Sequence, residues 1–219
     1  LLGKKRMVPR MCKCAREEYY ATKQLEENKE KQIRLESLIK NSLMDTSFYE
    51  KTFEAWDFKK GSRKMYNLGI KYVERFQELK KEGIGLLIHG DPGNGKTYLS
   101  CCIANRLLQA YTPVICVSIN GLLSRIKETY NKWGDEAEAD ILRGLGRADL
   151  LIIDDLGTET PTDWSRSTIY NIIDSRYRSK LPLIITTNLE VDTSKTGGIL
   201  AEMYGRRTED RIFEMCTPV

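Results

Sequence analysis

The sequence predicts an α/β fold in which helices cover both faces of a central parallel β-sheet. Short apolar runs alternate with longer helical patterns along most of the chain, which is typical of parallel strands joined by crossover helices. The runs 150–153 and 183–185 are continuously hydrophobic, as expected of strands buried on both faces. A glycine-rich segment, 90–97, lies between the first strand and the next helix, where such folds bind phosphates.

A charged extension precedes this domain. Residues 15–41 contain no proline or glycine and are dominated by charged and amide side chains, which predicts a mostly exposed helix. Four apolar residues at helical spacing form its expected contact stripe: Leu35, Leu38, Ile39 and Leu43. The stripe can serve a coiled coil or a partner, or it can pack against the chain's own domain. Both interpretations stay open.

The domain is expected to begin near residue 47. Aromatic residues gather in 47–57, and two of them, Phe53 and Trp56, are candidates for an adenine pocket because they precede the core. Residues 65–79 read as one amphipathic helix, and the first strand follows at 84–88. The later elements are expected in this order: helix 98–109, strand 114–119, helix 121–133, strand 150–154, helix 163–178, strand 183–187 and a helical tail to 214.

Composition indicates an ordinary soluble protein. The 219 residues suffice for one α/β domain with an extension, and no stretch approaches the roughly 20 apolar residues of a membrane helix. The chain starts without methionine or a secretory signal core, so we expect it to begin inside a longer protein. Most of the six cysteines lie in core-like segments, which favours reduced thiols and a cytoplasmic setting.

Positive charge is concentrated at the front of the chain. Residues 1–81 hold 20 lysines and arginines against 12 acids, whereas residues 82–219 hold 15 against 19. This polarity indicates a surface for nucleic acid or an acidic partner near the N-terminus, although a solvated helix with no partner explains it as well.

The segment 90–97 has the G-x-x-x-x-G-K-[ST] pattern of a phosphate loop. Its glycines allow backbone N–H groups to point inward, Lys96 can reach the β- and γ-phosphates, and the Thr97 hydroxyl can ligate Mg²⁺. The predicted binding residues for ATP are Gly90, Asp91, Pro92, Gly93, Asn94, Gly95, Lys96, Thr97 and Tyr98. The chain has no N-K-x-D motif for reading guanine, which disfavours a GTP switch.

Two acids end the buried strand 150–154 and have the form of a Walker B element. We expect Asp154 to hold Mg²⁺ and Asp155 to polarise the attacking water, which requires an ionised acceptor. The next buried strand ends at Asn188, on the edge of the sheet where ligands bind, so Asn188 suits a sensor of the γ-phosphate or of the water.

Together with these motifs, the segments 151–157, 169–177, 186–189 and 210–216 resemble the AAA+ ATPases of the bacterial and phage DnaC/DnaI helicase loaders and the related transposition helper IstB. The resemblance covers residues 48–219. It implies ATP-dependent assembly on single-stranded DNA, a core that forms homo-oligomers and an N-terminal region that binds the replicative helicase. By the same resemblance Asn188 is sensor 1, Arg211 is an arginine finger and Arg207 is a second basic residue of that box.

The chain departs from this family at both ends. It stops before the place where a sensor 2 arginine is usual, so we expect residues 47–219 to be an AAA+ domain truncated before sensor 2. Residues 1–46 then form part of the helicase-binding region. There Cys12 and Cys14 resemble the end of a zinc-binding domain, but two cysteines do not complete a four-ligand site. They are ligands only with an upstream pair, and free thiols otherwise.

The favoured function is ATP-dependent loading of a replicative helicase onto single-stranded DNA. The alternatives are an IstB-like helper acting on duplex DNA and a DNA-binding scaffold without catalysis. Asp155, in place of the usual Glu, supports the scaffold. A possible DNA-contacting group combines basic and aromatic side chains: Arg125, Lys127, Tyr130, Lys132 and Trp133. His89 is expected to be structural. Arg176, Arg178 and Lys180 are expected to cap the C-terminus of a helix, where positive charge is favoured.

Overall fold

The computed structural model describes residues 41–132, 135–192 and 197–219, and the single residues 20, 30, 33 and 37. The chain divides into two units, Leu1–Ser37 and Leu38–Val219. The four described residues of the first unit are helical and exposed. Leu35, Leu38 and Ile39 of the expected contact stripe lie outside the described residues.

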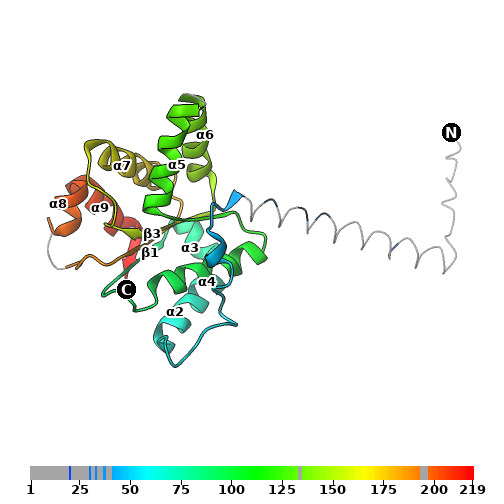
Figure 1. The fold of residues 1–219 in the computed structure, drawn as a ribbon. Coiled ribbons are helices and arrows are strands. Elements are labelled where there is room, and N and C mark those ends of the chain that lie inside the picture. The colour runs from blue at the N-terminus through cyan, green and yellow to red at the C-terminus, as the bar shows by residue number, and fades with distance from the viewer. Residues whose placement is uncertain are drawn as a thin grey trace, which may run out of the picture. The chain divides into compact units, whose positions relative to one another are not determined.

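The second unit is built on a five-stranded parallel sheet with the strand order β2-β3-β4-β1-β5 (Figure 1). The strands are β1 (Gly85–His89), β2 (Val114–Ser118), β3 (Leu150–Leu156), β4 (Leu183–Thr187) and β5 (Cys216–Pro218). In β1 and β4, and at Leu150–Asp154 of β3, nearly all side chains are buried, because helices cover both faces. The predicted parallel sheet is confirmed.

Successive residues of each strand contribute to two separate hydrophobic clusters. Leu86 and Ile88 pack on one face with α2 (Arg63–Glu74), α3 (Phe76–Glu82), α4 (Lys96–Gln109) and the 3₁₀ turn η1 (Thr46–Phe48). Leu87 packs on the other face with the remaining helices: α5 (Ile119–Lys132), α6 (Asp135–Arg147), α7 (Asp163–Arg178), α8 (Ile199–Tyr204) and α9 (Arg206–Met215). The second unit therefore has three layers, with the sheet in the middle.

The expected single helix over 65–79 is two helices. The chain bends at Arg75, whose φ of −98° and ψ of 10° end α2 and begin α3. The break lets Tyr72 and Phe76 both enter the hydrophobic cluster that contains Leu86, where they are 4% and 1% exposed.

Leu43 does not continue a helical stripe. Its φ of 56° takes it out of the helix, and its side chain packs against the cluster that contains Leu87. The preceding carbonyl, that of Ser42, accepts a hydrogen bond from the Cys116 amide of edge strand β2 at 2.9 Å. The segment thus covers an edge that would otherwise expose its polar backbone.

Two elements were not predicted. Helix α6 was missed because its apolar residues are few and glycines interrupt its second half. Strand β5 was missed because it has three residues and includes a proline, which suits only an edge strand. It pairs with β1 from Gly85↔Cys216 to Leu87↔Pro218, and places the chain's last residues beside the strand that leads into the phosphate loop.

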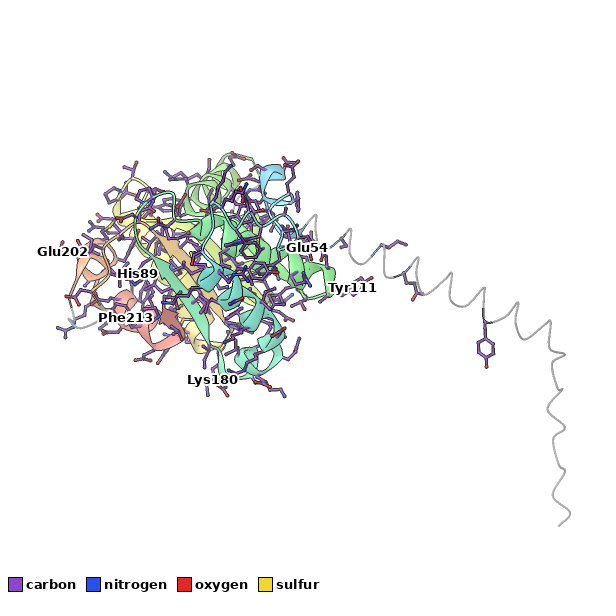
Figure 2. The ribbon with its side chains drawn as sticks, turned by 90° about the horizontal axis from the view of Figure 1, so that it is seen from below. Glu54, His89, Tyr111, Lys180, Glu202 and Phe213 are labelled. Carbon is purple, nitrogen blue, oxygen red and sulfur yellow. The ribbon has the colours of Figure 1, made fainter. Side chains whose placement is uncertain are left out.

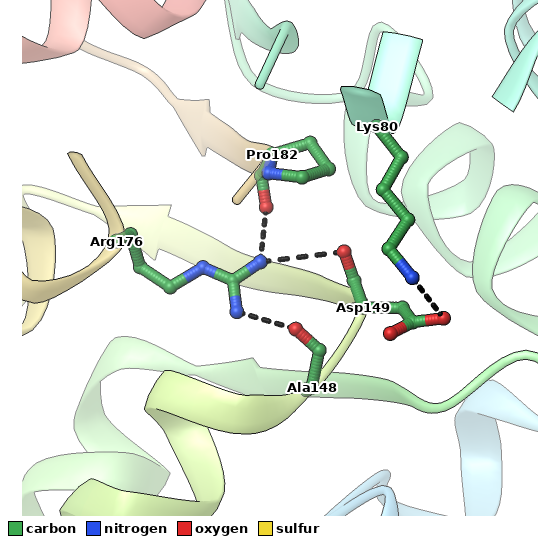
Figure 3. A network of polar contacts seen from close by, with 5 residues as sticks. All are labelled: Lys80, Ala148, Asp149, Arg176 and Pro182. Atoms are coloured by element: carbon green, nitrogen blue, oxygen red, sulfur yellow. Dashed lines mark hydrogen bonds and ion pairs between the residues drawn. The ribbon is translucent and has the colours of Figure 1, made fainter. Parts of the chain in front are cut away.

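Arg176 is buried completely, although it was expected to serve only the end of its own helix. Its guanidinium donates to four carbonyls of other segments: Leu145 at 3.0 Å, Ala148 at 2.6 Å, Asp149 at 3.5 Å and Pro182 at 2.5 Å. Figure 3 shows the last three of these bonds. Burial lowers the pKa of Arg176 to about 10. Arg176 therefore ties the loop before β3 to the loop before β4, at the edge of the sheet opposite the phosphate loop.

In Figure 2, His89 marks the side of the sheet where the strands end, and Lys180 marks the side where they begin. His89 is the last residue of β1, and Lys180 lies in the turn before the neighbouring strand β4. Because the strands are parallel, the polar residues that follow them all lie near His89, at the carboxyl ends of the strands. The site described next is on this side of the sheet.

Candidate nucleotide-binding site

The phosphate loop joins β1 to α4 and keeps an open inner face. Gly90, Gly93 and Gly95 have φ values of 132°, 84° and 83°, a conformation that side chains disfavour. A Cβ atom built at Gly93 or Gly95 would meet nothing within 4 Å. The loop is therefore an open cradle at the N-terminus of a 14-residue helix, where backbone N–H groups and the helix dipole favour an anion.

Lys96 lies across the mouth of this cradle. Its side chain is 6% exposed, and Nζ donates to the carbonyls of Gly90 and Asp91 at 2.8 Å each. An ammonium group has three donors, so one remains for a phosphate oxygen. The tight placement of Lys96 supports its predicted role.

Asp154 and Thr97 are brought together from β3 and α4. Asp154 is 2% exposed, and burial raises the pKa of its carboxyl, whereas hydrogen bonds from Thr186 and Thr97 act in the opposite direction. The Thr186 hydroxyl donates to Asp154 Oδ1 at 2.7 Å. A carboxylate and a hydroxyl beside a phosphate cradle are ligands that suit Mg²⁺.

Asp155 lies within β3, where the pairing of this strand with β4 becomes irregular. Its φ is 57°, a value that Asp tolerates better than most residues. Its carbonyl accepts from the Thr158 hydroxyl at 2.8 Å, and that hydroxyl accepts from Asn120 at 3.0 Å. Asn188 is exposed just after β4, on the same edge of the sheet.

The loop after β3 also contains an acid that sequence reasoning missed. Glu159 is 5% exposed and accepts from the Gly157 amide at 3.0 Å and from the Tyr204 hydroxyl. Burial and this carboxylate raise the pKa of Tyr204. Nothing local to Glu159 announces its burial, because its phenolic partner is 45 residues away.

The predicted arginines lie on α9 with different surroundings. Arg211 is paired with Asp174 of α7 at 2.6 Å, and its side chain is 18% exposed. Its guanidinium lies 4.7 Å from the ring centroid of Tyr170. Arg207, one turn earlier, is exposed. The structure thus brings together Lys96, Thr97 and Asp154, but holds Arg211 by residues outside that group.

A cavity of about 900 Å³ adjoins the phosphate loop. It is bounded by α2, β1, the loop and the end of β5, and its lining includes Lys64, Met65, Leu68, Asn94 and Lys96. Phe53 and Trp56, the earlier candidates for an adenine pocket, are not in the lining. They are 4% and 7% exposed and belong to the hydrophobic cluster that contains Leu86.

Tyr98 points away from the loop toward the segment that precedes α2. Its hydroxyl donates to the Ala55 carbonyl at 2.9 Å, and its ring meets that of Trp56 edge to face at 5.3 Å between centroids. The Tyr98 side chain therefore anchors α4 to the aromatic segment.

Several predicted residues fall outside what the structure describes: Cys12, Cys14, Trp133 and the side chains of Tyr130 and Lys132. Arg125 and Lys127 of α5 are exposed, and Lys127 Nζ lies 4.8 Å from the ring centroid of Trp164. Within the described residues no group of three or more histidine, cysteine or acidic side chains forms a metal site. None of the helices described is long and apolar enough to cross a membrane.

The chain is similar to proteins of DNA replication. It is 30% identical over 141 residues to the replicative helicase loader DnaC of Escherichia coli K12, which covers 64% of this chain and 54% of that protein. The chain thus spans about half the length of the curated relatives it matches.

Two crystal structures have the same architecture. One is of the DnaC helicase loader, with a TM-score of 0.64 and 24% identity, covering 80% of this chain and 98% of that one. The other is of DnaI, with a TM-score of 0.61 and 25% identity, covering 80% and 93%. The predicted P-loop AAA+ fold is thereby confirmed.

Residues 18–197 match the family described as IstB-like ATP binding protein. This match spans part of the extension, the phosphate loop and the Walker B strand, and it includes most of the residues whose geometry is described above. The chain therefore belongs to the family of IstB-like ATP binding proteins.

Proposed function

We propose that this chain is an ATP-dependent loader that delivers a replicative helicase onto single-stranded DNA in the cytoplasm. The observation that carries the proposal is the similarity to the helicase loader DnaC in a chain whose Lys96, Thr97 and Asp154 meet around an open phosphate loop. ATP would act as a conformational switch, so that hydrolysis releases the partner.

The chain's own residues supply the proposed ATP site. The backbone N–H groups of the loop and Lys96 would bind the phosphates, and the cavity beside Met65 would receive the nucleoside end. Thr97 and Asp154 would hold Mg²⁺, which neutralises charge on the phosphates when it is bound. This set fits the group because the cradle is open and the buried acid lies next to the hydroxyl.

The residue at the position of the catalytic acid is Asp155, which is shorter than the usual Glu. We assign Asp155 to orienting the attacking water and Asn188 to sensing the γ-phosphate. Arg211, with Arg207 beside it, would act on the site of a neighbouring subunit in a homo-oligomer. Exposure of Arg207 supports a contact outside its own chain.

Residues 1–46 would bind the helicase, and α5 would contact DNA. Exposed Arg125 and Lys127 provide phosphate attraction on α5, and Trp164 beside Lys127 adds an aromatic ring. The net positive charge of residues 1–81 supports an acidic partner for the front of the chain.

A second candidate function is that of a transposition helper that assembles on duplex DNA. The match of residues 18–197 to the IstB-like family favours it. A third is an ATP-dependent DNA-binding scaffold without useful catalysis, which the short acid at Asp155 favours.

Three measurements on the full-length protein separate the proposals: retention of the helicase on DNA, binding to duplex DNA and phosphate release. The cognate helicase is mixed with circular single-stranded DNA, and the helicase retained on the circles is measured with and without ATP. The loader proposal expects ATP-dependent retention that is lost in Lys96→Ala. Absence of any complex with the helicase, together with ATP-dependent binding to duplex DNA, would instead support the transposition helper. DNA binding without phosphate release would support the scaffold.

A further inference from the structure

The ladder between β3 and β4 is irregular at the Walker B acids. Pairing is regular from Leu151↔Leu183 to Ile153↔Ile185, but the next pair is Leu156↔Thr187. Two residues of β3, Asp154 and Asp155, therefore lie opposite one residue of β4, which is Thr186. This is the pattern of a β-bulge, a feature that redirects side chains near functional sites.

The Thr186 side chain repairs this interruption. Its Oγ1 accepts from the Asp155 amide at 2.8 Å and donates to Asp154 Oδ1 at 2.7 Å. A hydroxyl has one donor and two acceptor positions, so both bonds are made at once. Thr186 is 0% exposed and Asp154 is 2% exposed, so water does not compete for these bonds.

The two bonds act on different parts of the site. One fixes a carboxylate oxygen of Asp154, the acid that also meets Thr97. The other fixes the backbone at Asp155, whose φ of 57° sets the direction of its side chain. One hydroxyl on β4 thus determines the placement of both acids on β3.

We propose that Thr186 is a positioning residue of the nucleotide site: its hydroxyl holds the Asp154 carboxylate in the orientation that binds Mg²⁺ and holds the bulge that presents Asp155. This inference rests on the proposed function, because it takes Asp154 as the magnesium-side acid. The role assigned to Thr186 is to position the two acids, not to bind nucleotide or metal itself.

The chain offers a matched control in the next residue. Thr187 is also 0% exposed, and its hydroxyl bridges the same bulge by donating to the Leu156 carbonyl at 2.6 Å and accepting from the Leu189 amide at 3.1 Å. Both partners of Thr187 are backbone groups. Replacing either threonine by valine removes a buried hydroxyl from the bulge, but only Thr186→Val removes a bond to a Walker B carboxylate.

The experiment measures binding of a fluorescent ATP analogue to the full chain, in EDTA and across a Mg²⁺ titration. In Thr186→Val, the affinity for the ATP analogue in EDTA stays within about twofold of the parent. The Mg²⁺ concentration that gives half of the maximal increase in this affinity rises about 10-fold or more, as for other losses of a group that orients a metal ligand. Thr186→Ser restores the parent value, and Thr187→Val keeps it. Circular dichroism and thermal melting confirm that each variant is folded.

The inference is overturned if folded Thr186→Val has the parent's Mg²⁺ dependence, or if Thr187→Val changes it as much. If Thr186→Val does not fold, Thr186→Ala, which leaves room for a water molecule, is held to the same criterion. Failure of the proposed ATP site looks different, because the parent itself would then bind no nucleotide, and both conclusions would fall together.

Discussion

Arg211 of α9 forms an ion pair with Asp174 of α7, with 2.6 Å between Nη2 and Oδ1. The same carboxylate pairs through its other oxygen with Arg178 at 2.8 Å. The two arginines differ in exposure, since 18% of the Arg211 side chain and 72% of the Arg178 side chain are exposed. Arg211 is thus part of the packing between two helices. To act on a neighbouring subunit as proposed, it would have to leave Asp174.

This difference predicts unequal effects on stability. Arg211→Gln should lower the free energy of unfolding by about 1–3 kcal/mol, because it removes a sheltered ion pair and the contact with Tyr170. Arg178→Gln should change it by about 0.5 kcal/mol or less, since exposed pairs at this spacing contribute little. Urea denaturation measures both, and equal losses would contradict the prediction.

Lys96→Ala should weaken ATP binding by about 10- to 100-fold, because a hydrogen bond from a charged donor is worth roughly 1.5–3 kcal/mol. Calorimetry with the full chain gives the affinity. Lys64→Ala, which changes an exposed lysine in the cavity lining, is the control and should have a smaller effect. Unchanged affinity in Lys96→Ala would remove the basis of the proposed site.

Asp155→Asn should retain ATP binding within about twofold and lose hydrolysis by about 100-fold or more, the usual contribution of a general base. Asparagine also tolerates the left-handed backbone at this position, so the fold should be kept. Phosphate release in the presence of DNA is the measurement. If the hydrolysis rate does not fall, Asp155 is not the base that acts on the water.

Arg176→Met should lower the free energy of unfolding by roughly 3 kcal/mol or more, because it leaves the buried carbonyls of Ala148 and Pro182 without their donor. Arg176→Lys should be nearly as harmful, since an ammonium group cannot reproduce the planar fork. Arg178→Met, two residues along the same helix, serves as the control. Guanidinium denaturation followed by circular dichroism reports all three values.

The cysteines of the second unit should be inert in the folded protein. Cys101, Cys102, Cys116 and Cys216 are free and buried, as the sequence predicted for thiols in core segments. Burial raises the pKa of the Cys102 and Cys216 thiols, so the reactive thiolate is scarce at pH 8. In a Cys12→Ser, Cys14→Ser variant a thiol reagent should label no cysteine until denaturant is added. Rapid labelling of the native chain would refute this.

The sequence predicted the parts of the fold that have strong local signals. The continuous apolar runs of β3 and β4 and the glycines around Lys96 are readable because burial on both faces and a phosphate-binding turn each demand particular residues nearby. Helix α6 and strand β5 lack such signals, since one has few apolar residues and the other has only three residues.

Long-range partners could not be read in this way. Arg176 looked like an ordinary end-of-helix cation because the carbonyls that bind it come from two other loops. Thr186 looked like an ordinary strand residue until the β3–β4 register placed it opposite two acids. These roles depend on pairing between distant segments, which residue order alone does not reveal.

The bond between Glu159 and Tyr204 joins the loop behind the Walker B acids to the last residue of α8, next to the start of α9. Because the same carboxyl group also accepts from the Gly157 amide, that loop cannot shift without moving Tyr204 or breaking a buried hydrogen bond. A rearrangement at the acids would accordingly be transmitted to Arg206 and Arg207 through this hydrogen bond and the short stretch of backbone that follows Tyr204. In the proposed homo-oligomer, this bond would connect the loop after the Walker B acids to the helix that carries Arg207.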